Sequence, residues 1–240
     1  MSGYAKKPQN PNNYVIIDFE SGGVDLRINP VTEVALLSID GGNLKKIVEY
    51  QDLIAPYEES LVYEEKAFKV TNLSLEILEE EGLGVREVAE NVLKALEQTN
   101  NRQEKSPGLK PILIGHNVPF DINCLHHLMH WGLKNTSLDY QKELERVLHG
   151  RIDYFGNFQP TYMDTWSLGK MWFQGEGELT DYKLATLVDK LGIDLNNAHR
   201  AMNDVVSTAQ VVQNITNNLR SGYFKNYQNR GREGFYFPTP

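Results

Sequence analysis

The sequence has little of what disulfide-stabilised, secreted and membrane-spanning proteins depend on. Its 240 residues include one cysteine, Cys124, which excludes an internal disulfide and a cysteine-based zinc site. No run of about 18 apolar residues is present, as a membrane-spanning helix would require, and residues 1–13 lack the apolar segment of a secretory signal. We therefore expect a cytoplasmic protein without membrane association, in which Cys124 is a small core residue.

Positive charge is also scarce. The chain has 24 Lys and Arg against 32 Asp and Glu, which gives a formal net charge of −8 at pH 7. A protein that clamps a long duplex by neutralising its phosphates presents a basic face, and this composition argues against that mode of binding. An enzyme that takes a single strand end stays compatible with it, because metal ions held by carboxylates supply local positive charge.

The remaining composition is that of one globular domain. Hydrophobic residues make up 40% of the chain and charged residues 23%, which allows a sizeable core. We expect a disordered leader over residues 1–13, a folded domain over 14–219 and a tail over 220–240 that mixes basic and aromatic residues. Such a tail suits binding of nucleic acid or a partner, and equally packing on its own domain or exchange within a dimer.

The hydrophobic pattern predicts three strands first and mostly helices later. Apolar, β-branched runs predict strands at 14–18, 31–40, 44–54, 111–117 and 162–166. Between the second and third strands, Asp40-Gly41-Gly42 predicts a tight turn. Apolar residues three and four apart predict helices at 85–99, from Pro119 onward, at 167–173, at 184–191 before Gly192, and at 201–219. Within the poorly defined segment 135–160, residues 138–148 are a further candidate helix. This order is that of an α/β protein with a mixed sheet and helices packed on it.

Two carboxylates stand at the end of the first strand. Asp18 and Glu20 are separated by one residue, so they project from the same face about 6.5–7 Å apart along the backbone. Two-metal hydrolysis of a phosphodiester uses acidic ligands that hold the cations about 3.5–4 Å apart, and Mg²⁺ and Mn²⁺ prefer such oxygens. Taken alone, an Asp-x-Glu at a strand end is more often a solvated edge, so the pair needs partners.

Candidate partners occur further along the chain. Asp121 enters a helix after the strand at 111–117, with Leu125 on the same face; alone, it would be interpreted as an aspartate that stabilises the helix dipole. Asp204 lies four residues into the last helix, where capping is also the usual role. His199 precedes it by five residues and has the chemistry to accept a proton from an attacking water, although an isolated histidine at a helix start is more often a surface or packed residue.

Together these residues give the chain a resemblance to the DEDDh 3′→5′ exonucleases, the group that contains the proofreading subunit of bacterial DNA polymerase III and ribonuclease T. The resemblance spans about residues 14–215. It rests on IIDFES, ILIGHNVPFD and AHRAMNDVVSTAQV in the expected order, with MDTWSL and KLATLVDKLGI leading into the third motif. It implies a ribonuclease H-like fold with a mixed five-stranded sheet and flanking helices.

The resemblance also implies which residues carry the chemistry. His199 would be the general base, and two divalent cations, Mg²⁺ or Mn²⁺, would be held by Asp18, Glu20, Asp121 and Asp204. The tyrosine-type subfamily has Tyr four residues before the last aspartate, and this chain has Arg200 there, which favours the histidine type. Glu33 falls where members carry an acidic residue on the second strand. After Glu20 the chain has Ser-Gly-Gly in place of Thr-Thr-Gly or Thr-Gly, which leaves Ser21 as the hydroxyl near the terminal nucleotide.

Substrate contacts are expected from residues that flank the motifs, because single-strand ends are held by stacking on aromatic rings and by backbone contacts. The candidates are Phe19, Ser21, His116, Asn117 and Phe120; for the two phenylalanines, core packing is the competing interpretation. We expect hydrolysis of single-stranded 3′ ends to nucleoside monophosphates, with DNA favoured over RNA, in proofreading or end trimming. The alternatives are trimming of RNA and an inactive binding module of a polymerase complex. A polymerase subunit or a second copy of the chain is the expected protein partner.

Overall fold

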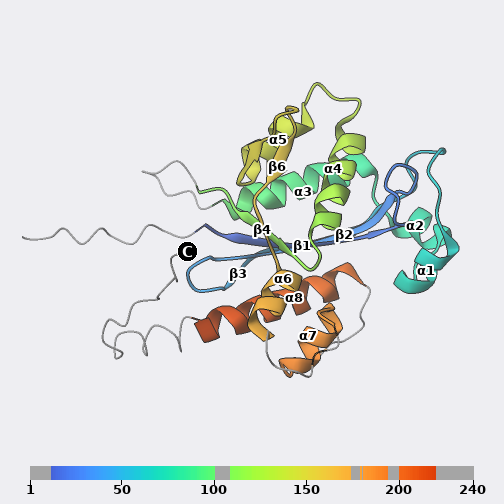
Figure 1. The fold of residues 1–240 in the computed structure, drawn as a ribbon. Helices are drawn as coiled ribbons and strands as arrows, with labels where there is room; N and C mark the ends of the chain where they lie inside the picture. Colours follow the sequence, from blue (N-terminus) through green and yellow to red (C-terminus); the bar gives the residue numbers. More distant parts are fainter. Residues whose placement is uncertain (1–11, 101–108, 174–178, 180, 194–199, 220–240) are drawn as a thin grey trace, which may run out of the picture.

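A five-stranded sheet runs through the centre of the molecule, with helices on both faces (Figure 1). The computed structural model describes residues 12–100, 109–173, 179, 181–193 and 200–219. The strands lie in the order β3-β2-β1-β4-β7. They are β1 (Tyr14–Ser21), β2 (Val31–Ile39), β3 (Lys46–Leu53), β4 (Ile112–Gly115) and β7 (Tyr162–Asp164). The first three are antiparallel, and β4 and β7 run parallel to β1, so the expected mixed five-stranded sheet is confirmed.

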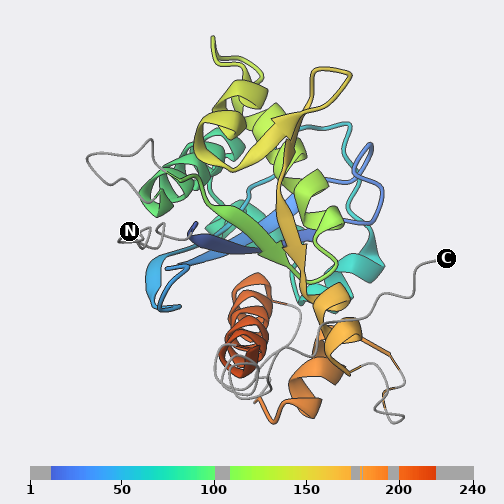
Figure 2. The ribbon, with the colours of Figure 1, turned by 60° about the vertical axis from the view of Figure 1, so that its left-hand side comes forward.

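The helices form two layers. One face of the sheet is covered by α3 (Val85–Thr99), α4 (Pro119–Leu133) and α5 (Tyr140–Val147). On the opposite face α8 (Ala201–Asn218) lies against β1 and β2, with α6 (Thr165–Phe173) and α7 (Leu184–Lys190) beside it (Figure 2). Every helix within the described residues is too short or too polar to cross a bilayer.

Alternation along β1 sends successive side chains to the two layers. Ile17 and Phe19 pack in the apolar cluster that includes α3 and α4, whereas Ile16 packs in the cluster that includes α8. Asp18 and Glu20 follow Ile16 at two-residue spacing, so they share its face of the strand. The same pattern that buries β1 therefore presents both carboxylates on the side of the last helix.

Several expected element ends are confirmed and others differ: β1 continues past Asp18 to Ser21, and the strand expected at 162–166 ends at Asp164, with Thr165 and Trp166 in α6. Pro119 is the first residue of α4, and Gly192 has a positive φ of 65° just after α7. The turn between β2 and β3 is wider than expected: the Asp40 carboxylate accepts the N–H groups of Gly42 and Asn43 at 2.9 Å. Its left-handed residue is Leu44, with φ 60°, and not one of the glycines.

Segments without a clear periodicity contain elements that the sequence did not predict. They are α1 (Glu65–Thr71), α2 (Leu75–Glu81), β5 (Gly150–Ile152) and β6 (Phe158–Pro160). β5 and β6 form a separate two-stranded sheet. At the other end, Asn13 of the expected leader is buried and donates from Nδ2 to the carbonyl of Thr99 at 2.8 Å, and the division into leader, domain and tail stays a prediction.

Candidate active site

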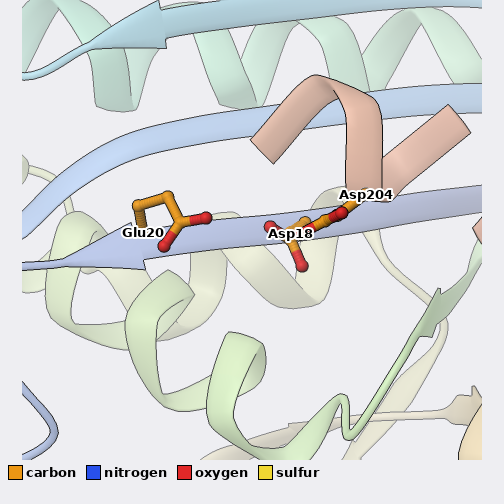
Figure 3. Close-up of side chains that lie close together, drawn as sticks. All are labelled: Asp18, Glu20 and Asp204. Carbon is orange, nitrogen blue, oxygen red and sulfur yellow. The ribbon is translucent and has the colours of Figure 1, made fainter. Parts of the chain in front are cut away.

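Three carboxylates meet where β1 passes under the first turn of α8 (Figure 3). One oxygen from each of Asp18, Glu20 and Asp204 lies within 4.8 Å of the other two. Asp18 and Glu20 come from β1, and Asp204 comes from α8. Three converging carboxylate oxygens are the donor set that hard divalent cations prefer.

Burial and mutual repulsion disfavour the ionised form of this cluster. Burial, together with the charges of Asp204 and Glu33, raises the pKa of Glu20 to about 8, and Arg200 opposes that rise. Burial is also the main cause that raises the pKa of Asp18, followed by the charges of neighbouring carboxylates. A divalent cation would stabilise the ionised carboxylates, so the electrostatics as well as the donor atoms fit a metal site.

Asp121 belongs to the same electrostatic unit. It lies in the first turn of α4, has 3% of its surface exposed, and accepts the backbone N–H of Phe19 at 3.1 Å. This hydrogen bond ties the start of α4 to β1 between the two carboxylates of that strand. After burial, the charge of Asp121 is the next cause of the raised pKa of Asp18. Its role as a fourth ligand stays a prediction.

The other expected site residues lie in different environments. His199 is outside the described residues, so its role as base stays a prediction. Phe19 has 4% of its surface exposed and packs in the core, and Phe120 packs against the same cluster; core packing, the competing interpretation, describes both. Ser21 donates its hydroxyl to the carbonyl of Gly23 at 2.6 Å.

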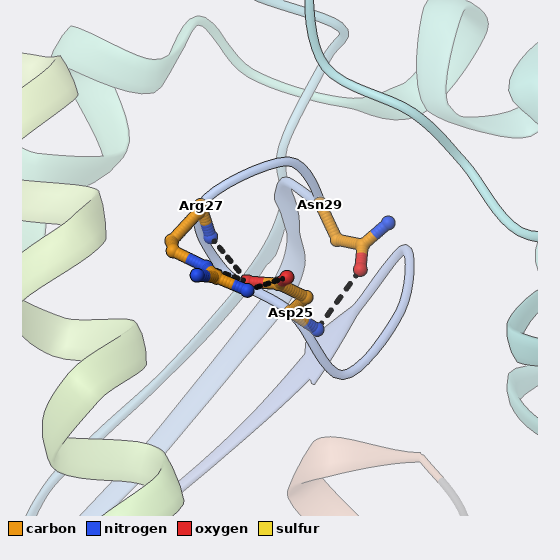
Figure 4. Close-up of polar contacts among 3 residues, drawn as sticks. All are labelled: Asp25, Arg27 and Asn29. Atoms are coloured by element: carbon orange, nitrogen blue, oxygen red, sulfur yellow. Dashed lines mark hydrogen bonds and ion pairs between the residues drawn. The ribbon is translucent and has the colours of Figure 1, made fainter.

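The loop that follows Glu20 is held by its own polar contacts (Figure 4). Arg27 Nε donates to Asp25 Oδ1 at 2.8 Å, and the Asp25 N–H donates to Asn29 Oδ1 at 3.0 Å. The N–H of Glu64, just before α1, donates to the carbonyl of Gly22 at 2.7 Å. The loop and the segment before α1 therefore form a fixed border at the end of β1.

A cavity of about 860 Å³ opens beside the acidic cluster. Its lining comes from β1, the turn between β4 and α4, the end of β7, helix α6, the start of α7 with the residue before it, and α8. The lining residues are Asp18, His116, Asn117, Asp164, Trp166, Ser167, Lys183, Leu184, Ala185 and Asp204. His116 and Asn117 therefore lie in the same cavity as Asp18 and Asp204, and their contact with substrate stays a prediction. The sequence did not single out Trp166 or Lys183, and the available signal was the likeness of MDTWSL and KLATLVDKLGI to the family.

Asp164 joins two walls of this cavity. Its Oδ1 accepts the N–H of Asn117 at 2.9 Å and that of Trp166 at 3.0 Å. Asn117 has a left-handed backbone, with φ 61°, and the neighbouring His116 Nδ1 lies 3.0 Å from Thr165 Oγ1. Burial lowers the pKa of His116. These contacts fix the turn after β4 to the start of α6.

An ion pair with a buried carboxylate positions the start of α8. Glu33 of β2 is fully buried and lies opposite Glu20 in the sheet. Arg200 donates to it from Nη2 at 3.1 Å and from Nε at 3.2 Å, and Gln51 Nε2 lies 2.5 Å from the same carboxylate. Asp204 follows Arg200 by one helical turn. The pair therefore holds the element that carries Asp204 against the strand beside Glu20.

Comparison with known proteins places the chain in a family. Residues 15–212 match the family described as Exonuclease, RNase_T. The chain is 28% identical over 198 residues to a PolC-type DNA polymerase III from Thermotoga maritima, which covers 82% of this chain and 11% of that protein. It is 24% identical over 203 residues to the 3′-5′ exonuclease DinG from Staphylococcus saprophyticus, and this match covers 83% of this chain and 17% of that protein. The chain thus spans a small part of the length of these relatives.

Solved structures support the same fold. Exonuclease I from E. coli, crystallised with a dT13 oligonucleotide, has a TM-score of 0.65 and 15% identity to this chain, covering 90% of it and 43% of the solved chain. This likeness confirms the α/β, ribonuclease H-like fold. Because the family match extends over residues 15–212 of 240, the chain belongs to the RNase_T exonucleases, the DnaQ-like family of 3′→5′ exonucleases.

Proposed function

We propose that this chain is a metal-dependent 3′→5′ exonuclease that hydrolyses single-stranded DNA ends to nucleoside monophosphates. The observation that carries the proposal is the convergence of Asp18, Glu20 and Asp204 within 4.8 Å, in a member of an exonuclease family. The cavity that begins at Asp18 and Asp204 gives a strand end access to these carboxylates.

The chain's own residues would hold two divalent cations, Mg²⁺ or Mn²⁺. Asp18, Glu20 and Asp204 are the ligands, and Asp121 completes the acidic set. Cations bound there would help to activate a water molecule and to stabilise charge on the departing 3′ oxygen. Asp121 keeps α4 against β1 through its hydrogen bond with the Phe19 N–H, so the ligand-bearing strand is fixed from the other side of the sheet.

Following the family resemblance, we assign to His199 the role of general base, which accepts the proton of the attacking water. Histidine titrates near neutral pH and therefore accepts a proton under ordinary conditions. His199 immediately precedes Arg200, whose guanidinium is anchored on Glu33. That anchor holds Arg200, the residue that precedes α8, against β2.

DNA is the favoured substrate because of the proteins that the chain is similar to. One relative is a DNA polymerase, and exonuclease I was crystallised with a DNA oligonucleotide. The hydrolytic step itself does not depend on the sugar, so discrimination depends on how the 2′-hydroxyl is received. Trimming of RNA ends is therefore the alternative that the test must separate.

The test is hydrolysis of a 5′-labelled single-stranded DNA oligonucleotide with Mg²⁺ or Mn²⁺, beside a chelated sample, the Asp18→Ala variant and a matched RNA. We expect a ladder that shortens from the 3′ end of the DNA and is absent in both controls. Degradation of the RNA alone would show that RNA, and not DNA, is the substrate. If neither strand is cut, the inactive-module alternative is favoured, and equilibrium sedimentation with polymerase subunits then tests a binding role.

A further inference from the structure

We propose that the cavity between the acidic cluster and helices α6 and α7 is a second nucleotide subsite. It would hold the nucleotide on the 5′ side of the scissile phosphate, with its base stacked on Trp166 and a backbone phosphate paired with Lys183. This inference rests on the proposed function, because it describes how the strand that remains after cleavage is held.

The two sides of the acidic cluster are built differently. On the side of Glu20, residues 22–30 form a loop whose Gly22 N–H donates to the Pro30 carbonyl at 2.8 Å, and the Glu64 N–H closes onto Gly22 at 2.7 Å. This border blocks further passage of a nucleic-acid strand, so the position beside it suits the terminal nucleotide. On the side of Asp18 and Asp204, the cavity of about 860 Å³ begins. The rest of the nucleic-acid strand would lie in this cavity.

Trp166 is held in place and still presents its ring to the cavity. It has 40% of its surface exposed. Tyr182 contacts it edge-on with centroids 6.2 Å apart, and Lys170 Nζ lies 5.2 Å from the ring centroid. The Asp164 carboxylate binds its backbone N–H at 3.0 Å. An indole fixed in this way and left partly open is a platform on which any base stacks, independent of sequence.

Lys183 supplies positive charge at the lining of the same cavity. Its side chain is 81% exposed, and Nζ lies 3.7 Å from Asp181 Oδ2. Asp181 is also engaged through Oδ1, which accepts the Thr186 hydroxyl at 2.5 Å. Helices α6 and α7 pack closely because Gly169 of α6 has no side chain. A Cβ at that position would lie 2.7 Å from the methyl groups of Leu187 of α7. In a chain of net charge −8, a lysine at this cavity is suited to a phosphate.

The decisive comparison uses two substrates of different length. In the p-nitrophenyl ester of thymidine 5′-monophosphate, nitrophenolate replaces the upstream nucleotide as the leaving group, so this substrate lacks the base and the phosphate that the second subsite would hold. A single-stranded oligothymidylate has both. We expect Trp166→Ala to lower kcat/KM on the oligonucleotide by about 5- to 150-fold, the range for loss of one base stack, and to leave kcat/KM on the ester nearly unchanged. Trp166→Phe should recover most of this loss, because phenylalanine also stacks.

Lys183→Gln should reduce the salt dependence of KM for the oligonucleotide. Each phosphate contact contributes about 0.7 to the slope of log affinity against log salt for single strands, so the slope should fall by about 0.7. Matched controls lie elsewhere in the chain: Tyr154→Ala removes an aromatic ring that is 97% exposed in the β5–β6 hairpin, and Lys134→Gln removes an exposed lysine at the end of α4. The thermal midpoints of all variants are compared first.

Equal losses on ester and oligonucleotide, or no loss on the oligonucleotide, would overturn the subsite. Failure of the native chain to cut either substrate would instead overturn the proposed function. In that case the subsite is judged by binding, from the anisotropy of a 5′-labelled oligonucleotide in Ca²⁺. Weaker binding by Trp166→Ala than by Tyr154→Ala supports the subsite, and equal binding rejects it.

Discussion

Asp18 is a residue at which ligand chemistry and folding stability oppose each other. Burial raises its pKa, because the charged form loses hydration, and nearby carboxylates add to the rise. Asparagine keeps the shape and removes the charge. We expect Asp18→Asn to lower kcat by more than about 100-fold, beyond the effect of an outer residue of a metal site. The same change should raise the unfolding midpoint of the metal-free protein by at least about 2 °C.

Turnover with Mn²⁺ and scanning fluorimetry in chelator check the two halves of this prediction separately. Near-normal turnover would show that the metal site is misplaced. A lowered midpoint would show that Asp18 contributes hydrogen bonds that outweigh its charge repulsion. Ser38→Ala, at a buried residue whose hydroxyl pairs with Thr99, is a control for polar substitution outside the acidic cluster.

His199→Ala should have a different signature. Loss of a general base lowers the rate by about 10²- to 10⁴-fold, and it leaves the carboxylates intact. We therefore expect a folded protein whose Mn²⁺ concentration for half-maximal binding, measured by calorimetry, matches that of the native chain. A large loss of Mn²⁺ affinity would instead make His199 a ligand or an organiser of the metal site.

Single residues were predictable from the sequence where they combine a reactive side chain with the end of an element. Asp18 and Asp204 meet this condition, and their convergence is confirmed. Trp166 and Lys183 do not, because one aromatic and one lysine in helical segments have many ordinary explanations. Phe19 shows the limit of proximity along the chain: it adjoins both metal-site candidates, but strand alternation turns it into the core.

At the scale of elements, the pair of Arg200 and Glu33 fastens α8 to β2. Glu33 is fully buried, so removal of its partner leaves a buried carboxylate without its cation. We expect Arg200→Met to lower the free energy of unfolding by about 1–3 kcal/mol, a value reduced from that of a fully buried pair because the Arg200 side chain is 40% exposed. Urea unfolding of the metal-free protein measures it.

The double variant Glu33→Gln/Arg200→Met identifies the cause. We expect it to recover part of the loss, with a coupling of about 0.5–3 kcal/mol, because no unpaired buried charge is left. Arg86→Met is the matched control, since Arg86 and Glu90 form an exposed pair on α3 and such pairs contribute about 0.3–0.5 kcal/mol. Equal effects of Arg200→Met and Arg86→Met would contradict the anchoring role.

Elements were predictable where the hydrophobic pattern marks them, which holds even for β3, a strand without a fully buried residue. All nine residues of β2 are buried, and a mostly apolar run in the sequence predicts this strand. The residues of β5 are all exposed, and among the residues of α2 only Leu78 is buried, so neither has a periodicity to detect. Their positions follow from contacts with distant segments, as when Leu83 donates its N–H to the carbonyl of Leu53.

At the scale of the whole molecule, the acidic cluster links stability to pH. The pKa of Glu20 is raised from its ordinary value of 4.5 to about 8, so between these values the folded chain keeps a proton that the unfolded chain has released. Folding stability therefore falls as pH rises through this window. The exposed aspartates with lowered pKa, such as Asp25, change ionisation below it.

For the metal-free protein we expect the unfolding midpoint to fall by about 4 °C or more from pH 5 to pH 8. A tenfold change in proton affinity corresponds to about 1.4 kcal/mol, and 1 kcal/mol moves the midpoint of a chain of this size by about 2–4 °C. Addition of Mn²⁺ at pH 8 should reverse the fall. An unfolding midpoint of the metal-free protein that rises with pH between 5 and 8 would contradict the coupling.

The sheet order could be predicted only through the family resemblance. Hydrophobic patterns specify strands, but they do not specify that β1 lies between β2 and β4. That position depends on pairing between segments far apart in the chain, such as Tyr14 with Ile112. The acidic cluster depends on it too, because α8 brings Asp204 to Asp18 and Glu20 by packing on β1 and β2.

The separation of the ligands along the chain sets when the site can exist. Asp18 and Glu20 lie on the first strand, and Asp204 lies on the last helix of the described fold. During synthesis the first two carboxylates are therefore made long before the third, and α8, which packs on both β1 and β2, completes the cluster last. A nascent chain that lacks α8 carries only two of the three converging carboxylates.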